Sequence, residues 1–205
     1  MKSDLPLMRR EELTVLLIDI QPMFWDAMAD PAPGLAERLR HLLMLAAAWE
    51  MPTIATLEQP VARKGSLVDF LLPVFPSDGR IREKNTFDCC AESGIVELLT
   101  DGSGRQVALA GAETDVCVLQ SALGLRRLGF DVFLIEDCVF SSAHDTAAAL
   151  RRMYQAGVIP VTWKSMAYEL AGAVDAAPWL PESQDRESQD RGGRLPDAFR
   201  APENI

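Results

Sequence analysis

The middle of this chain reads Val107-Ala108-Leu109-Ala110-Gly111-Ala112-Glu113-Thr114-Asp115-Val116-Cys117-Val118. Its first four residues are apolar and predict a buried strand, and residues 119–125 after it have the spacing of a helix. Cys117 is therefore predicted at, or just inside, a helix N-terminus, where free backbone N–H groups and the helix dipole favour a thiolate. This position makes Cys117 a candidate nucleophile, although an isolated cysteine among apolar residues is more often an unreactive core residue.

Strands and helices alternate on both sides of this stretch. Residues 14–18 form a continuous apolar run of the kind that is buried on both faces of a parallel sheet. Pro160 has no N–H to donate to a neighbour, which favours an edge position for the last strand. Besides 107–110, the predicted strands are 14–18, 53–56, 80–84, 131–135 and 158–162, and the predicted helices are 34–49, 66–72, 93–99, 119–125 and 143–156. This alternation predicts an α/β fold with a doubly wound, mostly parallel sheet of about six strands and helices on both faces.

Length and composition predict one globular domain followed by a tail. The chain has 205 residues, of which 48% are hydrophobic, and a mean hydropathy of +0.03. The folded domain is expected over residues 1–180. Residues 181–205 are expected to form a flexible polar tail, because Glu-Ser-Gln-Asp-Arg at 182–186 repeats at once at 187–191. Leu195 and Phe199 offer a second possibility, in which this tail docks on a neighbouring subunit.

Charge and hydropathy exclude several classes of partner. A net charge of −10 and a pI of about 4.7 argue against nucleic acid and anionic membranes. No run approaches the roughly 18 apolar residues of a membrane span. The first residues lack the apolar core of a signal peptide, so a cytoplasmic protein with a small-molecule substrate is expected.

Cysteine and histidine usage argues against disulfides and a zinc site. The chain has four cysteines, Cys89, Cys90, Cys117 and Cys138, and two histidines. Disulfides are uncommon in the cytoplasm, so the cysteines are expected to be free thiols. No Cys-x-x-Cys spacing occurs, which argues against a zinc site. Neither a metal nor another cofactor is expected. The adjacent Cys89 and Cys90 favour a packing role over a redox switch, because neighbouring cysteines form strained disulfides.

Three chemically complementary residues lie at the ends of predicted strands. Asp19 follows the strand 14–18, Lys84 ends the strand 80–84, and Cys117 lies just past the strand 107–110. Ligands of a doubly wound sheet bind at the carboxyl ends of the strands, so the three residues are predicted to face one cleft. There a carboxylate can take the thiol proton, an ammonium lowers the pKa of the thiol, and the thiolate attacks an electrophilic carbon. Taken singly, each residue also has a plainer role: Asp19 in a turn, Lys84 as a surface charge and Cys117 in the core.

The order of the motifs resembles a known family. Ile-Asp-Ile-Gln at 18–21, then Lys84 with Phe87 after it, and then residues 111–118 resemble the isochorismatase-like cysteine hydrolase superfamily. The resemblance continues through Leu-Gly-Phe at 128–130, Glu-Asp-Cys at 136–138 and Ala-Gly-Val at 156–158, and so covers about residues 13–171. Its most specific part is the Gly-x-x-Thr-x-x-Cys-Val element that ends at Val118.

This resemblance implies an active site as well as a Rossmann-like, isochorismatase-type fold. The Asp-Lys-Cys triad of the family maps onto Asp19, Lys84 and Cys117. The family also has a non-proline cis peptide, here Ala112–Glu113, that aims the backbone N–H groups of Glu113 and Cys117 into an oxyanion hole. Because the fold commonly oligomerises, a homo-oligomer, dimeric or larger, is implied.

Departures from the family pattern narrow the expected chemistry. Nicotinamidases of the superfamily carry an Asp-x-His and a further histidine that bind a metal, whereas residues 56–60 here are Thr-Leu-Glu-Gln-Pro. The chain therefore resembles a metal-free branch whose substrates are often unknown. Isochorismatases that cleave a vinyl ether lack the cysteine, so Cys117 favours hydrolysis of a C–N bond. The candidate substrate-binding residues are Phe24, Trp25, Gln59 and Phe87.

The first hypothesis is a cysteine-dependent hydrolase of a small amide-like bond. Cys117 is the nucleophile, Asp19 the general base and then acid, and Lys84 the electrostatic support. The alternatives are a thiol redox or sensing protein that uses Cys117 with Cys89 or Cys90, an isochorismatase-type hydrolase of another small metabolite, and a non-catalytic assembly module. The sequence does not identify the substrate, because loops 21–33 and 57–80 carry no diagnostic residues.

Overall fold

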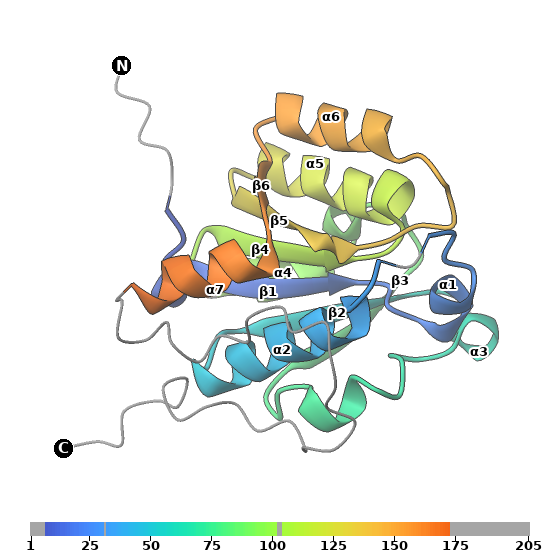
Figure 1. Ribbon diagram of the computed structural model, residues 1–205, viewed down its shortest axis with the longest axis horizontal. Coiled ribbons are helices and arrows are strands. Elements are labelled where there is room, and N and C mark those ends of the chain that lie inside the picture. Colours follow the sequence, from blue (N-terminus) through green and yellow to red (C-terminus); the bar gives the residue numbers. More distant parts are fainter. Residues whose placement is uncertain (1–6, 31, 102–103, 173–205) are drawn as a thin grey trace.

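One parallel sheet forms the centre of the structure, a computed structural model that describes residues 7–30, 32–101 and 104–172 (Figure 1). Within these residues the sheet has six strands in the order β3-β2-β1-β4-β5-β6, and every neighbouring pair is parallel. The strands are β1 (Leu13–Ile18), β2 (Thr53–Glu58), β3 (Arg80–Lys84), β4 (Gln106–Gly111), β5 (Asp131–Val139) and β6 (Ile159–Val161). The predicted doubly wound α/β fold is confirmed, and β6, which contains Pro160, lies at an edge as predicted.

Helices cover both faces of the sheet because side chains alternate along the buried strands. Leu17 of β1 packs with α2 and α7 on one face, whereas its neighbours Leu16 and Ile18 pack with α4, α5 and α6 on the other. Figure 1 shows α5 and α6 together on one side of the sheet and α2 on the opposite side. The helices are α1 (Pro22–Asp26), α2 (Leu35–Ala48), α3 (Val61–Lys64), α4 (Ser93–Asp101), α5 (Leu119–Arg127), α6 (Ala147–Gln155) and α7 (Trp163–Ala171).

The strand order reverses between β1 and β4 at the centre of the sheet. From β1 the chain moves out through β2 to β3, and it returns to place β4 on the other side of β1. Such a reversal leaves a crevice at the carboxyl ends of the two central strands, where ligands bind in this architecture. Asp19 follows β1 and Cys117 follows β4, so the fold places both residues at this crevice.

Several predicted boundaries differ from the structure. The helix predicted over 66–72 is wrong: those residues form turns that lead into a 3₁₀ turn at Leu72–Val74, and Pro73 disfavours a helical residue before it. The helix predicted from residue 143 begins at Ala147, because the Asp145 carboxylate accepts the Ala147 N–H at 2.9 Å and closes a turn there. The short helices α1 and α3 and the helix α7 were not predicted, and the predicted tail over 181–205 lies outside the described residues.

Candidate active site

Asp19 is held at the carboxyl end of β1 by the neighbouring strand β2. Its backbone adopts a left-handed conformation with φ 48°, which aspartate tolerates better than most residues. The Asp19 N–H donates to the Thr56 carbonyl and hydroxyl oxygens, both at 3.2 Å, and the Thr56 hydroxyl donates to Asp19 Oδ1 at 2.7 Å. The carboxylate is fully buried and has a fixed orientation, with Oδ2 directed at Lys84.

Lys84 is the last residue of the edge strand β3 and the one buried residue of that strand. Its side chain is 0% exposed, a rare environment for a lysine unless it is paired. The Nζ atom lies 2.6 Å from Asp19 Oδ2 and 3.6 Å from Cys117 Sγ, and it donates to the Thr86 carbonyl at 3.0 Å. Lys84 therefore connects the carboxylate after β1 to the thiol after β4.

Cys117 lies in a π-helical turn, η4 (Thr114–Val118), that leads directly into α5. The chain can turn closely past β1 because residue 111 is glycine: φ is 116°, and a Cβ there would lie 2.1 Å from the Ile18 carbonyl oxygen. The Ala112–Glu113 peptide that follows is cis. The turn brings Cys117 Sγ, which is buried, to 3.0 Å from Glu58 Oε2.

Glu58 is the member of this cluster that the sequence pattern did not reveal. It is the last residue of β2, and its Oε1 forms an ion pair with Lys64 Nζ of α3, while its Oε2 lies 3.7 Å from Lys84 Nζ. The Gln21 side chain accepts the Glu58 N–H at 2.7 Å and donates to the Glu58 carbonyl at 3.3 Å. The predicted strand 53–56 stopped two residues early, and extending it would have placed Glu58 at the same edge as Asp19.

The electrostatics of the cluster differ from the sequence-based expectation for Cys117. Burial raises the pKa of the Cys117 thiol, and the Asp19 charge and the Glu58 carboxylate raise it further, so that together they outweigh Lys84. These surroundings oppose the thiolate that is expected at a helix N-terminus, because they favour the protonated thiol. The expected effect of Lys84 on the thiol pKa has the right direction, but it is too small to dominate.

The two carboxylates have pKa values shifted in opposite directions. Burial raises the pKa of Asp19 more than Lys84 lowers it. Burial also acts upward on Glu58, but the hydrogen bonds from Cys117 and Lys64 and the charge of Lys84 outweigh it, so the pKa of Glu58 is below its usual value. Burial opposes the charge on Lys84, yet Asp19 and its other partners raise the Lys84 pKa above the ordinary value. The site thus has an ionised Glu58 beside a more readily protonated Asp19.

Asp19, Glu58 and Cys117 are spaced as the ligands of a cation would be, but the ammonium group of Lys84 already lies among them. Ligand atoms of Asp19, Glu58 and Cys117 lie within 4.8 Å of one another. The Lys84 ammonium contacts Asp19, Cys117 and Glu58, and supplies the positive charge that a metal ion would otherwise provide. We therefore assign no metal to this group of residues.

The structure brings only some of the predicted substrate-binding residues toward one another. Phe24 and Trp25 lie in α1, directly after the Asp19 turn, and both are half-buried. The Trp25 ring contacts the Phe70 and Phe140 rings at centroid distances of 4.7 and 5.3 Å, and Lys64 Nζ lies 5.6 Å from the Phe24 ring centroid.

Gln59 and Phe87 have other surroundings. The Gln59 side chain donates to the Glu83 carboxylate and accepts the Val61 N–H at 3.1 Å, and Phe87 is 51% exposed. The prediction that these four residues contact a substrate stays a prediction.

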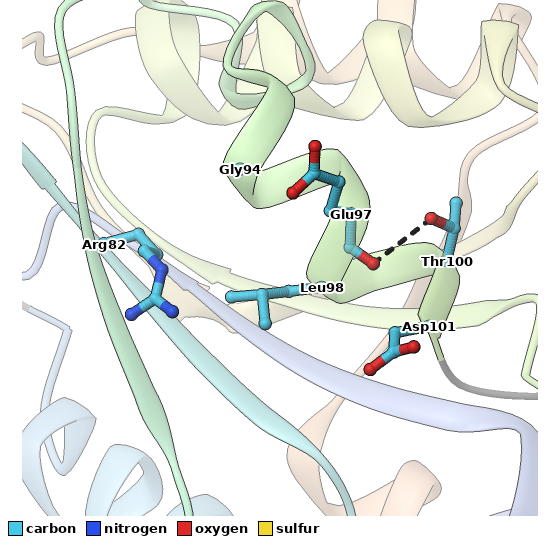
Figure 2. Close-up of a pocket in the computed structure, with 6 residues that line it drawn as sticks. All are labelled: Arg82, Gly94, Glu97, Leu98, Thr100 and Asp101. Atoms are coloured by element: carbon cyan, nitrogen blue, oxygen red, sulfur yellow. Dashed lines mark hydrogen bonds between the residues drawn. The ribbon is translucent and has the colours of Figure 1, made fainter.

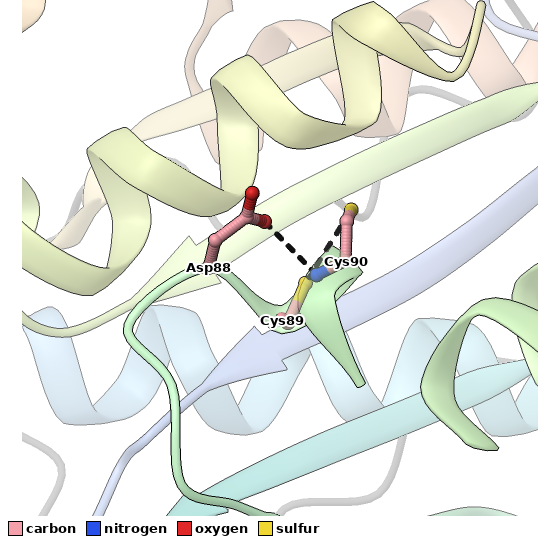
Figure 3. Close-up of side chains that lie close together, drawn as sticks. All are labelled: Asp88, Cys89 and Cys90. Carbon is pink, nitrogen blue, oxygen red and sulfur yellow. Dashed lines mark hydrogen bonds between the residues drawn. The ribbon is translucent and has the colours of Figure 1, made fainter. Parts of the chain in front are cut away.

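A second group of thiols lies beside the cluster, on a 3₁₀ turn, η3 (Cys89–Ala91). Figure 3 shows the side chains of Cys89 and Cys90 on this turn and that of Asp88 directly before it. The Cys89 and Cys90 sulfur atoms are 4.0 Å apart. The Asp88 carboxylate caps the turn by accepting the Cys90 N–H at 2.9 Å and pairs with Arg127 at 2.6 Å. Cys117 contacts Lys84 and Glu58, whereas Cys89 and Cys90 contact each other, and all the cysteines are free thiols.

A surface pocket between β3 and α4 is separate from these residues. Figure 2 shows it lined by Arg82 of β3 and by residues of α4, which are Gly94, Glu97, Leu98, Thr100 and Asp101. None of its lining residues belongs to the group around Cys117. The pocket therefore supplies no group to the chemistry at Cys117.

Comparisons with known proteins identify the family of the chain. The isochorismatase domain matches residues 14–165. The probable hydrolase YcaC of Escherichia coli is 29% identical over 163 residues, which are 78% of each chain. The structure of YcaC from Pseudomonas aeruginosa with hexane-2,5-diol and covalent acrylamide has a TM-score of 0.76 and 26% identity, and the match covers 82% of this chain and 85% of that one.

A further solved relative is the MAR1 ribonuclease of Caenorhabditis elegans, with a TM-score of 0.79 and 25% identity over 93% of this chain and all of that one (100%). In the part of the chain that the structure describes, no helix has the length and apolar character needed to cross a membrane. The family match covers most of the chain and includes the strands and turns that carry Asp19, Lys84 and Cys117. The chain therefore belongs to the isochorismatase family and is a hydrolase.

Proposed function

We propose that this protein hydrolyses a small amide-like C–N bond through a covalent intermediate on Cys117. The observation that carries the proposal is the position of the Lys84 ammonium, which lies 2.6 Å from Asp19 Oδ2 and 3.6 Å from Cys117 Sγ. Three buried groups of complementary chemistry meet at the strand reversal, where this architecture binds ligands. A structural lysine would need only the carboxylate as a partner, whereas this lysine also contacts the nucleophile.

The steps follow from these contacts. A carboxylate of the cluster takes the thiol proton, with Asp19 as the residue that the family resemblance names, and Sγ forms a bond to the carbonyl carbon. The C–N bond then breaks, and the leaving nitrogen receives the proton. Water attacks the resulting thioester, which releases the acid and restores the thiol. Lys84 offsets the negative charge that passes between the carboxylate and the sulfur.

The negative charge on the carbonyl oxygen needs donors of its own. The cis peptide at Ala112–Glu113 precedes the turn that carries Cys117, and the Glu113 N–H has no hydrogen-bond partner among the described residues. We assign the N–H groups of Glu113 and Cys117 to this oxyanion hole. Phe24, Trp25, Gln59 and Phe87 are the proposed substrate contacts.

Two facts about relatives support the proposal. The Pseudomonas aeruginosa YcaC structure contains a covalent acrylamide, and formation of such an adduct needs a nucleophile on the protein. The Escherichia coli YcaC structure is described as an octameric hydrolase of unknown specificity. By analogy we propose that this chain forms a homo-oligomer in the cytoplasm, and light scattering of the purified protein measures its assembly state.

The ribonuclease name of the Caenorhabditis elegans relative is not transferred to this chain. A net charge of −10 opposes binding of a phosphate backbone, which cationic side chains normally neutralise. A small, uncharged carbonyl compound is the better match to a nearly closed site of paired charges.

A panel of small amides, ureides and esters, tested on the wild-type protein and on Cys117→Ala, decides the proposal. We expect hydrolysis of at least one amide or ureide, with loss of turnover in Cys117→Ala. Cys138→Ala is the matched control, because Cys138 is buried and lies in the other hydrophobic cluster. Turnover that persists in Cys117→Ala at the wild-type rate would overturn the proposal.

A further inference from the structure

Glu58 is the carboxylate that accepts the Cys117 thiol. Cys117 Sγ donates to Glu58 Oε2 at 3.0 Å, and Glu58 Oε1 pairs with Lys64 Nζ, which also donates to the Gln59 carbonyl at 2.8 Å. The two hydrogen bonds between Gln21 and the Glu58 backbone fix the residue at the end of β2. With 12% of its side chain exposed, Glu58 is the most accessible of the residues around the thiol.

The other carboxylate, Asp19, has its shortest contacts with two other residues. Asp19 Oδ1 accepts the Thr56 hydroxyl at 2.7 Å, and Asp19 Oδ2 pairs with Lys84 Nζ at 2.6 Å. Asp19 lies within 4.8 Å of the thiol and also forms a hydrogen bond with Cys117, but its shortest contacts are with Thr56 and Lys84. The shortest contacts therefore distinguish the two acids: Asp19 is closest to the Lys84 ammonium, at 2.6 Å, and Glu58 accepts the Cys117 thiol at 3.0 Å.

The balance of charge gives this distinction a consequence. Two carboxylates, Asp19 and Glu58, face two ammonium groups, Lys84 and Lys64, so the buried group is neutral while Cys117 is a thiol. Loss of the thiol proton to solvent would leave one unpaired negative charge in a site shielded from water, which is costly. Transfer of that proton to a carboxylate within the group keeps the total charge at zero.

Building on the proposed function, we infer that Glu58 is a further catalytic residue, which keeps Cys117 a thiol at rest and takes up its proton during attack. The proton moves from Sγ to Glu58 Oε2 while the S–C bond forms and the carbonyl electron pair moves onto its oxygen. Glu58 or Asp19 returns the proton to the nitrogen when the C–N bond breaks. Lys64 holds the Glu58 carboxylate in place and is a positioning residue.

The charged and titratable groups around Glu58 come from four elements. Cys117 faces it from η4, Lys84 from β3 and Lys64 from α3, and Asp19, directly after β1, has a carboxylate oxygen within 4.8 Å of both Glu58 and Cys117. Burial acts upward on the pKa of Glu58, but the hydrogen bond from the thiol and the two ammonium groups outweigh it and lower that pKa, so the carboxylate that accepts the thiol is ionised at neutral pH.

The experiment follows alkylation of Cys117 by iodoacetamide as a function of pH, read by peptide mass spectrometry so that the other cysteines do not contribute. In the wild type we expect the midpoint above the value of about 8.5 for a free cysteine. Glu58→Gln removes a negative charge from the thiol and should lower the midpoint by about one unit or more. Glu97→Gln, which removes the same charge from the exposed pocket of Figure 2, should leave it unchanged.

Lys64→Met supplies a second variant with the opposite sign. Loss of the Lys64 ammonium leaves the negative charge of Glu58 without its ion-pair partner. A thiolate beside that charge is then less favourable, so the pH midpoint of Cys117 alkylation should rise. An unchanged midpoint in both Glu58→Gln and Lys64→Met, or a wild-type midpoint well below that of free cysteine, would overturn the inference.

Turnover separates proton transfer from simple suppression of the thiolate. If Glu58 carries the proton, Glu58→Gln should lose about 10²-fold or more in kcat even though more of its Cys117 is ionised. If turnover in Glu58→Gln rises together with the ionised fraction of Cys117, the catalytic role of Glu58 is refuted. The alkylation readout needs no substrate, so shifted midpoints without any amide hydrolysis would contradict the proposed function alone. Hydrolysis that depends on Cys117 but not on Glu58 would contradict this inference alone.

Discussion

Two neighbouring parts of this molecule place thiols beside carboxylates, and their surroundings differ. Around Cys117, the carboxylates of Asp19 and Glu58 are buried or nearly so and pair with lysine ammonium groups. On the turn with Cys89 and Cys90, the Asp88 carboxylate is used by the Cys90 N–H and by the exposed Arg127. The Cys117 thiol contacts a carboxylate and an ammonium, whereas Cys89 and Cys90 contact each other and Cys90 also contacts the Asp88 carboxylate.

The difference shows that a cysteine in an apolar cluster does not become a nucleophile through burial alone. Cys89 and Cys117 both belong to the hydrophobic cluster beneath α5, and both are at most 2% exposed. What distinguishes Cys117 is a hydrogen-bond acceptor for its proton and a cation 3.6 Å from its sulfur. Substitutions that remove these partners should therefore affect Cys117 strongly, and equivalent changes at Asp88 should affect the protein weakly.

The largest effect is expected for Lys84→Met. This change leaves Asp19 buried without its ion-pair partner, which costs about 3–5 kcal/mol in the free energy of unfolding. Turnover should also fall by about 10²–10³-fold, because the charge on the sulfur is no longer offset. Urea denaturation and the amide assay measure the two effects. In Arg127→Met, the matched control at the other site, the exposed ion pair contributes only about 0–1 kcal/mol. Equal stability of the two variants would contradict the comparison.

A smaller effect is expected from alkaline pH. The pKa of Cys117 is raised in the folded state, so the stability that the protonated thiol contributes is complete below the unfolded pKa of about 8.5. Above that pH the unfolded chain binds fewer protons than the folded one. The free energy of unfolding should therefore fall as pH rises toward the folded pKa, by at most about 1.4 kcal/mol per pH unit from this group.

Denaturation at several pH values between neutral and strongly alkaline tests this slope. Cys117→Ala should show a shallower loss than the wild type, while the contribution of the buried Cys138, whose pKa is also raised by burial, remains in both proteins. Identical slopes would mean that Cys117 has an ordinary pKa in the folded state.

The Asp88→Ala change should have a modest effect confined to stability. It removes the side-chain cap of the turn that starts at Cys89, which is worth about 1 kcal/mol in typical helix caps. Amide turnover should stay close to the wild-type rate, since the Asp88 carboxylate contacts the Cys90 N–H and Arg127 and not Cys117. Loss of turnover at unchanged stability would show that the two thiol groups act together.

The smallest expected effect concerns oxidation. The Cys89 and Cys90 sulfurs lie 4.0 Å apart, about twice the S–S bond length of about 2.05 Å, and Cys117 faces Glu58 and Lys84. After mild peroxide we expect no disulfide that includes Cys117, as read by non-reducing peptide mass spectrometry. A specific, reversible Cys117–Cys89 or Cys117–Cys90 bond would favour the redox alternative instead.

Much of the fold was predictable because its signals are local. The alternation of apolar runs with stretches of helical spacing was sufficient to predict the parallel sheet, and Pro160 was sufficient to place the last strand at its edge. The short helices were not predictable in this way: α3 has four residues and lies directly after a cis Gln59–Pro60 bond, so it has no hydrophobic period to detect.

The candidate site was predictable in its residues but not in its charges. Asp19, Lys84 and Cys117 lie at strand ends, and that rule alone places them together. The direction of the Cys117 pKa shift depends on the sum of burial, two carboxylates and one ammonium at distances that only the folded chain defines. Glu58 was missed because the predicted strand 53–56 ended two residues before β2 does, and a charged residue at 58 does not continue the apolar run.

Direct detection of the covalent intermediate tests the assignment of Cys117 as nucleophile. The amide that the wild-type protein hydrolyses fastest is mixed with the enzyme, the reaction is stopped with acid during turnover, and the peptides are weighed. We predict an acyl group on the peptide that contains Cys117, and unmodified peptides for Cys89, Cys90 and Cys138. Sustained hydrolysis without an acyl group on Cys117, together with an active Cys117→Ala protein, would contradict it.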